Sequence, residues 1–252
     1  MPPPIVLRQF LDDANSDELA AALMVTQLIE PNADVDGARR ALELLSSAFL
    51  SAGDVSAERL CTFLSAEGFE GATDYYALEN SRLDHVLAAR RGIPITLAVV
   101  CLEIARAARL DAHGLNAPGH FLVGIGQSMV DPFTLRVLRA EERAARVAQS
   151  GGTALERATP VGIALRMLNN VRTILAARQD WVSVLTTLDH QLVLSPRSAD
   201  LHLARAEVWE HLGARDAARA ALEEARRFAG DELARHIDTV LARLGQSGSV
   251  LH

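Results

Sequence analysis

The sequence has no lysine, since all 25 of its basic residues are arginines. Enzymes that form a Schiff base with a substrate or with pyridoxal phosphate require a lysine, and so do Walker-type phosphate-binding loops. The absence of lysine therefore excludes these classes of protein.

Cysteine and metal-binding patterns are scarce as well. The two cysteines, Cys61 and Cys101, are too few for a disulfide framework and lack the spacing of a metal site. The eight histidines include no His-x₃-His pair, and no acidic loop of the calcium-binding type is present. We therefore expect no bound metal and no other cofactor.

Long apolar runs and an excess of positive charge are also missing. No uncharged run approaches the ~18 apolar residues of a transmembrane helix, and Met1-Pro2-Pro3-Pro4 does not resemble the start of a secretory signal. The net charge of −7 argues against a nucleic-acid-binding surface, which needs clustered basic residues. These absences predict a cytoplasmic protein that binds neither nucleic acid nor membrane.

The residues that are present favour helix. Of the 252 residues, 49% are hydrophobic and only 4% are aromatic, and the good helix formers alanine, leucine and arginine dominate. Apolar periodicity predicts helices near residues 16–29, 36–52 and 56–66. Another helix is predicted from Pro94, a residue tolerated at the first helical position, to about Leu110. Its body is apolar on nearly all sides, which predicts a buried central helix.

Strand-like segments follow this helix. They are Ala112–Asn116, Gly119–Ile125 and Ser128–Asp131, and Gly126-Gln127 separates the last two. If Gly126-Gln127 is a two-residue turn, Ile125 pairs with Ser128. This register predicts that His120 and Asp131 lie on one face of the sheet, as diagonal neighbours close enough to hydrogen-bond.

The rest of the chain is predicted to be helical and to form a second domain. Residues 149–153, Gln-Ser-Gly-Gly-Thr, are the best linker candidate, so we expect one domain over residues 1–153 and a helical domain over residues 154–252. A period of 34 residues places Val184 over Ala218 and Leu188 over Leu222. We therefore expect these four residues to be buried between helices.

This period resembles that of tetratricopeptide (TPR) repeats, with one unit over Leu165–Ser198 and a second over Ala199–Glu232. TPR arrays generally bind peptides or partner proteins in a concave groove, so the resemblance implies a protein or peptide partner. The alternative is that two repeats are too few for an independent groove and only brace the first domain.

The residues that could carry chemistry lie in one constellation. A tight Gly92-Ile93-Pro94 turn leads into the buried helix, His120 opens one strand, and Asp131 ends the next. This order is typical of a thiol nucleophile at a helix N-terminus, with a histidine base and an orienting aspartate.

Here the sequence resembles the transglutaminase-like superfamily, and its layout looks most like the bacterial SirB-type branch. The resemblance rests on three segments: Arg90–Thr96, Gly119–Val123 and Asp131-Pro132-Phe133. It implies an α+β fold that is mainly α, with a helical lead-in, a papain-like core containing a small antiparallel sheet, and C-terminal TPR-type helical hairpins. It also implies that His120 and Asp131 occupy the histidine and aspartate positions of a catalytic triad.

The departure from the family lies at the nucleophile. In the family this helix begins Gly-x-Cys and carries a small residue four positions later. Counting back from Arg106 aligns Ala98 with the family's small residue and Pro94 with its nucleophilic cysteine. Proline has no nucleophilic side chain. Thr96 is turned away from residue 94 by helical phase, Cys101 lies deep in the apolar stretch, and Cys61 comes from the lead-in helices.

Three functions follow from this constellation. The first is a non-catalytic transglutaminase-like protein with TPR repeats that binds a protein or peptide. The second is a hydrolase or acyltransferase in which the His120–Asp131 pair works with a non-family nucleophile. The third is a TPR adaptor whose N-terminal domain has no function of its own. A structural hydrogen bond between His120 and Asp131 is the alternative to a general-base pair.

Three polar residues near the expected cleft are candidates to bind a ligand carboxylate: Asn80, Arg90 and Arg91. The alternative for the two arginines is an ordinary exposed position at a helix end.

Overall fold

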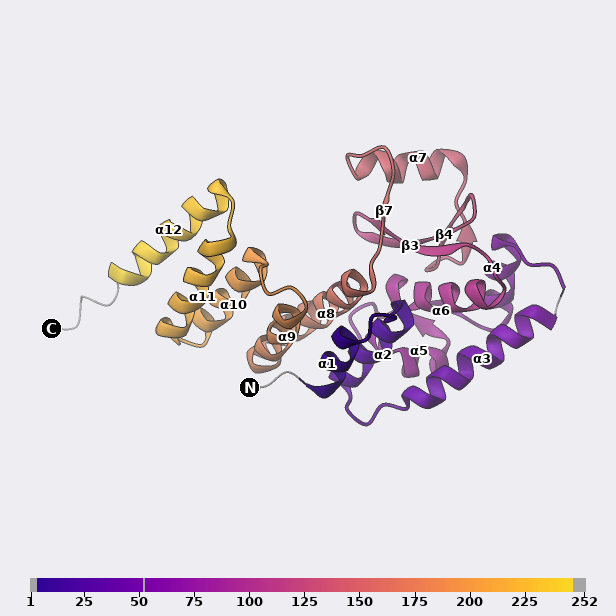
Figure 1. Ribbon diagram of the computed structural model, residues 1–252, viewed down its shortest axis with the longest axis horizontal. Coiled ribbons are helices and arrows are strands. Elements are labelled where there is room, and N and C mark those ends of the chain that lie inside the picture. Colours follow the sequence, from indigo (N-terminus) through magenta and orange to yellow (C-terminus); the bar gives the residue numbers. More distant parts are fainter. Residues whose placement is uncertain (1–3, 52, 247–252) are drawn as a thin grey trace. The chain divides into compact units, whose positions relative to one another are not determined.

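The structure is a computed structural model that describes residues 4–51 and 53–246 (Figure 1). These residues form two compact units, one up to Met167 and one from Leu168 onward. Helices predominate, and the main sheet has five antiparallel strands. The predicted fold class, α+β but mainly α, is therefore confirmed. Among the described helices, none is long and apolar enough to cross a membrane.

The boundary between the units differs from the predicted position at residue 153. Strand β7 (Glu156–Arg157) lies beyond the predicted linker, yet it pairs with β3 (Ala112–Ala117) in the main sheet. The first unit consequently continues into helix α8 (Pro160–Ala177). A glycine-rich stretch marks a loop, but only the strand pairing shows to which unit the following residues belong.

The first unit begins with helices. They are α1 (Ile5–Asp12), α2 (Glu18–Ile29), α3 (Val35–Ser51) and α4 (Ala57–Ala66), followed by β1 (Glu70–Gly71), the 3₁₀ helix η1 (Leu78–Ser81), α5 (Leu83–Ala89), β2 (Arg91–Gly92) and α6 (Pro94–Ala107). After β3 come β4 (His120–Ile125), β5 (Ser128–Asp131), β6 (Arg136–Val137) and α7 (Ala140–Gln149). Helices α2, α3, α4 and α6 were predicted from the sequence, whereas α1 was not.

The main sheet has the strand order β6-β5-β4-β3-β7. Strand β4 pairs with β5 through Ile125↔Ser128 and Val123↔Val130, so Gly126-Gln127 is the predicted two-residue turn. Because side chains alternate along a strand, this register fixes which residues of β4 and β5 share a face.

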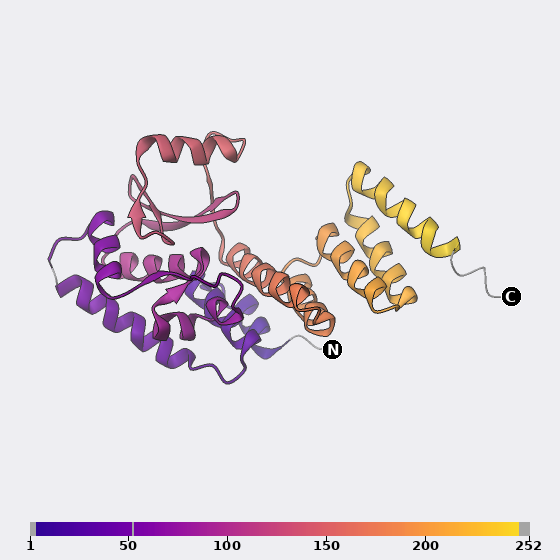
Figure 2. The same ribbon diagram turned by 180° about the vertical axis from the view of Figure 1, so that it is seen from behind.

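The sheet lies between two helices, as Figures 1 and 2 show, with α7 on one face and α6 on the other. Helix α6 is the buried centre of the unit, because almost every residue from Ile95 to Ala105 is buried. Helix α7 is amphipathic and contributes half-buried Val147 to a cluster with Leu115, Leu122 and Leu138. The prediction of a buried central helix is therefore confirmed.

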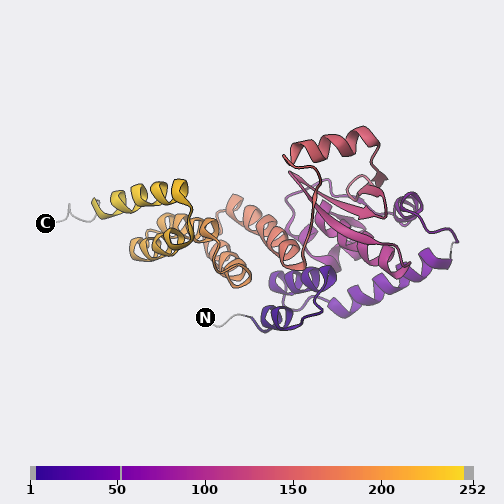
Figure 3. The same ribbon diagram turned by 45° about the horizontal axis from the view of Figure 1, so that its top comes forward.

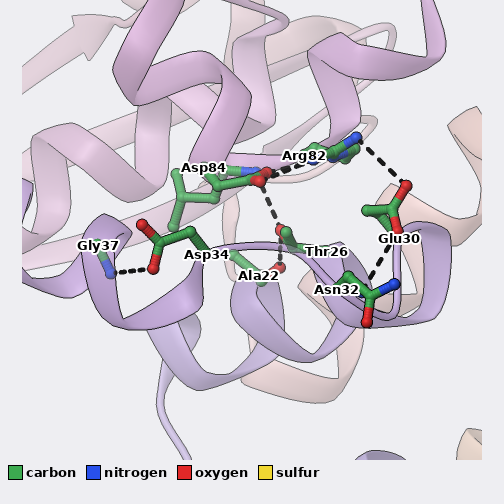
Figure 4. A network of polar contacts seen from close by, with 9 residues as sticks. Ala22, Thr26, Glu30, Asn32, Asp34, Gly37, Arg82 and Asp84 are labelled. Atoms are coloured by element: carbon green, nitrogen blue, oxygen red, sulfur yellow. Dashed lines mark hydrogen bonds and ion pairs between the residues drawn. The ribbon is translucent and has the colours of Figure 1, made fainter.

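A polar network holds the segment before α6 against the lead-in helices (Figure 4). The hydroxyl of buried Thr26 accepts a hydrogen bond from the backbone N–H of Leu83 at 2.9 Å. Next to it, the guanidinium of Arg82 pairs with Asp84 at 2.7 Å and lies 3.9 Å from the carboxylate of Glu30. These contacts fix the start of α5 on α2, and α5 leads directly into the turn before Pro94.

The second unit consists of antiparallel helices. After the C-terminal part of α8 come α9 (Trp181–Leu194), α10 (Ala199–His211), α11 (Arg215–Phe228) and α12 (Asp231–Gln246). Helices α10 and α11 pack side by side, as Figure 3 shows. Helices α9 and α11 have equal lengths and begin 34 positions apart (215 − 181). The four residues predicted to be buried, Val184, Leu188, Ala218 and Leu222, are between 0% and 2% exposed.

Leu188 provides a direct test of this packing. We expect Leu188→Ala to reduce the free energy of unfolding by about 2–5 kcal/mol, because the Leu188 side chain is 0% exposed and its loss leaves a cavity in the cluster that it forms with Val184 and Val208. The control is Val182→Ala on the same helix, where the side chain is 69% exposed. The control should change stability by less than about 0.5 kcal/mol. Equal losses for both variants in urea unfolding would contradict the helix packing.

Candidate functional site

The start of α6 is built around a proline and a glycine. Pro94 is the first helical residue, after Ile93 at the N-cap position. A Cβ atom on Gly92 would lie 2.7 Å from the Thr96 hydroxyl and 2.9 Å from Val86, so only glycine fits there. The Thr96 hydroxyl donates to the carbonyl of Asn80 at 3.0 Å, or to that of Ile93 at 3.1 Å. The turn is therefore closely packed up to Pro94.

His120 and Asp131 occupy the strand positions predicted for them. His120 is the first residue of β4 and Asp131 is the last residue of β5. The register places both on the same face as Leu122 and Met129. The Asp131 carboxylate is buried, and its Oδ1 accepts hydrogen bonds from the backbone N–H of Phe133 at 2.9 Å and of Thr134 at 3.4 Å. Within the described residues, no hydrogen bond joins His120 to Asp131, so a triad interaction between them stays a prediction.

The segment after Asp131 lies beside the turn that starts α6. The ring of Phe133 covers Gly71 so closely that a Cβ atom there would be 2.6 Å from it. Gly71 in turn pairs with Gly92 in the parallel β1–β2 ladder, two residues before Pro94. At its other end α6 is tied to β3, because Arg106 Nε donates to the carbonyl of Ala112 at 3.4 Å. The fold thus brings the Asp-Pro-Phe segment to the N-terminus of α6.

None of the alternative nucleophiles is poised for reaction. Burial raises the pKa of the Cys61 thiol to about 12, with smaller contributions from the negative charges of Glu58 and Asp131. Burial also raises the pKa of Cys101, which is 1% exposed. The Thr96 hydroxyl is fully buried and donates its proton to backbone carbonyls. A thiol with a raised pKa carries almost no thiolate at neutral pH, and the thiolate is the nucleophile.

The three polar residues predicted to bind a carboxylate have protein partners in the structure. Asn80 is buried and donates from Nδ2 to the carbonyl of Asp74 at 2.6 Å. Arg91 is exposed and pairs with Glu70 across the β1–β2 ladder. The guanidinium of Arg90 lies over the Phe69 ring, 4.7 Å from its centroid, and its buried Nη1 has no hydrogen-bond partner in the described residues.

Arg166 is a residue of this unit that the sequence did not single out. It comes from α8 and donates to Asn116 Oδ1 at 3.0 Å and to the backbone carbonyl of His120 at 2.8 Å. Its guanidinium lies 5.2 Å from the centre of the Phe121 ring. No local pattern identifies it, because its partners lie about fifty positions away in the sequence.

The second unit contains a hollow of about 380 Å³ among α8, α9 and α10. Its floor is apolar and includes Val184, Leu188 and Val208, each less than 10% exposed. The imidazole of His211 stacks on the Trp181 ring with 4.5 Å between centroids. Pockets with an apolar floor and a few polar groups at the rim are typical ligand-binding sites.

Metal-ligand geometry is absent from the part of the chain that the structure describes, where no three histidine, cysteine, aspartate or glutamate side chains converge.

Comparison with known proteins agrees with the fold. The family described as the transglutaminase-like superfamily matches residues 33–169. A UPF0162 protein of Xylella fastidiosa (strain 9a5c) is 34% identical over 168 residues, which cover 60% of this chain and 60% of that protein. A UPF0162 protein of Pseudomonas aeruginosa is 30% identical over 200 residues, covering 75% of this chain and 72% of that protein. No solved structure matches the chain significantly. The chain belongs to the transglutaminase-like superfamily.

Proposed function

We propose that this chain is a non-catalytic member of the superfamily, of the SirB-type branch, whose TPR-like C-terminal unit binds a protein or peptide in the cytoplasm. The observation that carries the proposal is Pro94, which starts α6 where the resemblance places the catalytic thiol. A proline there suits the helix, because the N–H that it lacks would have no intrahelical partner. It leaves that position without a nucleophile.

The buried state of the other candidate nucleophiles supports the same function. A hydrolase or acyltransferase that used His120 and Asp131 would need Cys61, Cys101 or another group to attack the substrate. Both thiols have raised pKa values because they are buried. Incubation of the full chain with a thiol-directed activity probe and with a set of peptide substrates should therefore give neither labelling nor cleavage. Turnover of any peptide that His120→Ala abolishes would overturn the non-catalytic function.

The hollow of the second unit supports binding through that unit. Three features there suit a peptide: an apolar floor, a stacked aromatic pair at the edge, and two side chains of opposite charge, Arg172 and Glu207. Burial lowers the pKa of the Arg172 guanidinium, an effect that the nearby Glu207 opposes. In the described residues no ion pair joins Arg172 to Glu207, so both charges remain available to a ligand.

Filling the hollow should block this binding. Thr173 and Thr186 form a matched pair, since both are exposed and each hydroxyl donates to the carbonyl four residues earlier. Only Thr173 lines the hollow. For a peptide selected by display on the full chain, we expect Thr173→Arg to weaken binding at least about tenfold, as at a contact residue of an interface. Thr186→Arg should bind like the wild type. If calorimetry shows that both variants bind equally well, the hollow is not the peptide site.

A further inference from the structure

A stacked pair of rings borders the hollow of the second unit. Trp181 is the first residue of α9 and His211 is the last residue of α10, and both line the hollow. Their rings are nearly parallel, with 9° between the planes and 4.5 Å between the centroids. Trp181 is half-buried, whereas His211 is exposed. Because the indole covers one face of the imidazole, the rest of the imidazole ring offers a free aromatic surface to a ligand.

The other walls of the hollow are apolar and leave room for one large side chain. Its floor is formed by Val184, Leu188 and Val208, which are between 0% and 6% exposed. Its volume of about 380 Å³ lies near the lower end of the range for ligand pockets, about 300–1,000 Å³. Two hollows of similar size in the first unit have no phenylalanine, tyrosine or tryptophan among their lining residues. The stacked pair therefore distinguishes the hollow of the second unit.

Two exposed apolar side chains lie at the same end of α9 and α10. Val182 and Leu212 each follow one member of the stacked pair, and they are 69% and 42% exposed. Among the described residues from Leu168 onward, they are the only large hydrophobic side chains that are exposed. An ion pair of 3.2 Å joins Asp189 to Arg205. Val182 precedes Asp189 by seven residues (189 − 182) and Leu212 follows Arg205 by seven (212 − 205), which is about two helical turns in each case. The two apolar side chains therefore lie on the same side of the helices, beside the stacked pair.

We infer that the hollow holds an aromatic side chain of the bound peptide, whose ring lies against the Trp181–His211 pair. This inference rests on the function proposed above and names the residue type that the site selects. An aromatic ring in contact with another ring strengthens binding by a factor of about two to ten beyond the area that it buries, which an aliphatic side chain does not. The exposed side chains of Val182 and Leu212 add apolar surface for the neighbouring part of the peptide.

The charges at the rim disfavour an ionised side chain in the hollow. A peptide arginine could also stack on the rings, but the guanidinium of Arg172 lines the hollow and would repel it. A peptide carboxylate would be repelled by Glu207 and would lose its hydration against the apolar floor. An uncharged aromatic ring avoids both costs.

The first test is the selection of random linear peptides, displayed on phage, against the full chain. Among the selected peptides that Thr173→Arg weakens, we expect one position to be occupied predominantly by tryptophan, tyrosine or phenylalanine. Replacing that residue by alanine should weaken binding at least about tenfold. Predominance of arginine or of aliphatic residues would overturn the inference and leave peptide binding in the hollow intact. If Thr173→Arg weakens none of the selected peptides, the proposed function and this inference both fail.

A double-mutant cycle then locates the aromatic ring. The two changes are His211→Ala in the protein and leucine for the aromatic residue in the peptide, and calorimetry gives the four Kd values. We expect His211→Ala to weaken the aromatic peptide about two- to tenfold and to leave the leucine peptide nearly unchanged. Because His211 is exposed, the variant should fold normally. Equal losses for the two peptides would overturn the placement of the ring.

His236→Ala is the matched control for this cycle. His236 is also an exposed histidine of the second unit, but it does not line the hollow. The variant should bind both peptides like the wild type. If it weakened the aromatic peptide as much as His211→Ala does, the effect of His211→Ala would not come from the stacked pair, and the inference would be wrong.

Discussion

Replacing Arg106 by methionine is expected to remove about 3 kcal/mol of stability at pH 8, because the change breaks a buried ion pair. The two Nη atoms of Arg106 donate to both carboxylate oxygens of Glu18 at 2.6 and 2.7 Å, and Nη1 lies 3.8 Å from Glu103. Glu18 on α2 and Glu103 on α6 are both largely buried, with side chains 10% and 20% exposed. Without the arginine, both carboxylates lose their counter-charge.

The loss should depend on pH. Burial, and then repulsion by Asp17, raise the pKa of Glu103 to about 7. Burial is the strongest single influence on Glu18 and would also raise its pKa, but the hydrogen bonds and charge of Arg106, a backbone hydrogen bond and the charge of His113 together lower that pKa. In the variant we expect the folded-state pKa values of Glu18 and Glu103 both to lie above the unfolded value of 4.5. Ionisation of these two carboxyls then costs stability as the pH rises from about 4.5 towards and beyond 7. The difference between wild type and variant should therefore be larger at pH 8 than at pH 5.

An exposed pair provides the control for this prediction. Arg136 donates from two nitrogens to Glu142, each at 2.9 Å, but the arginine side chain is 48% exposed. Arg136→Met should therefore have a much smaller effect on urea unfolding than Arg106→Met, at both pH values. Equal destabilisation of the two variants would contradict the conclusion that the buried pair holds α2 to α6. A loss of stability in Arg106→Met, relative to wild type, that is as large at pH 5 as at pH 8 would contradict it as well.

The local elements around the candidate site could be predicted from the sequence because their signals are local. The pair Gly126-Gln127 between two apolar runs predicted the β4–β5 turn, and the two-residue length of this turn predicted the register of the two strands. The apolar run after Pro94 gave the buried helix with its correct first residue. In the second unit, the 34-residue period identified four positions that are buried in the structure.

Long-range contacts were not predictable in this way. Strand β7 has only two residues, and its pairing with β3 is decided by residues 40 positions away, so the unit boundary was placed too early. Helix α1 was missed, since it has only eight residues and directly follows a proline-rich start. The partners of Asn80, Arg90 and Arg91 and the position of Arg166 depend on how distant segments pack. For the same reason, the distance between Pro94 and the His120 ring does not follow from the sequence.

Replacing Pro94 by cysteine is expected to create an unusually acidic thiol. The first turn of a helix has free N–H groups and a positive dipole end, which both stabilise a thiolate. If His120 occupies the family position facing residue 94, its protonated form adds to this effect. The thiol pKa should then fall from ~8.5 towards the 3.5–7.5 range of activated cysteines. Because proline at the first helical position makes no intrahelical hydrogen bond, the fold should tolerate the change.

The structure supplies a matched control in Pro160, a half-buried proline that starts helix α8. A cysteine at position 160 would also lie at a helix N-terminus, but position 160 does not correspond to the position that faces the histidine of the family's triad. Cys61 and Cys101 are buried with raised pKa values, so peptide mapping of the labelled full chain reports mainly the introduced thiol.

The decisive measurement is the rate of alkylation by iodoacetamide at pH 6 for Pro94→Cys, Pro160→Cys and Pro94→Cys with His120→Ala. If Pro94 stands in the vacated nucleophile position, Pro94→Cys should react about tenfold faster than Pro160→Cys, and His120→Ala should remove most of that gain. Equal rates for the two single variants, with no effect of His120→Ala, would show that Pro94 merely starts a helix and would contradict the non-catalytic account of this superfamily member.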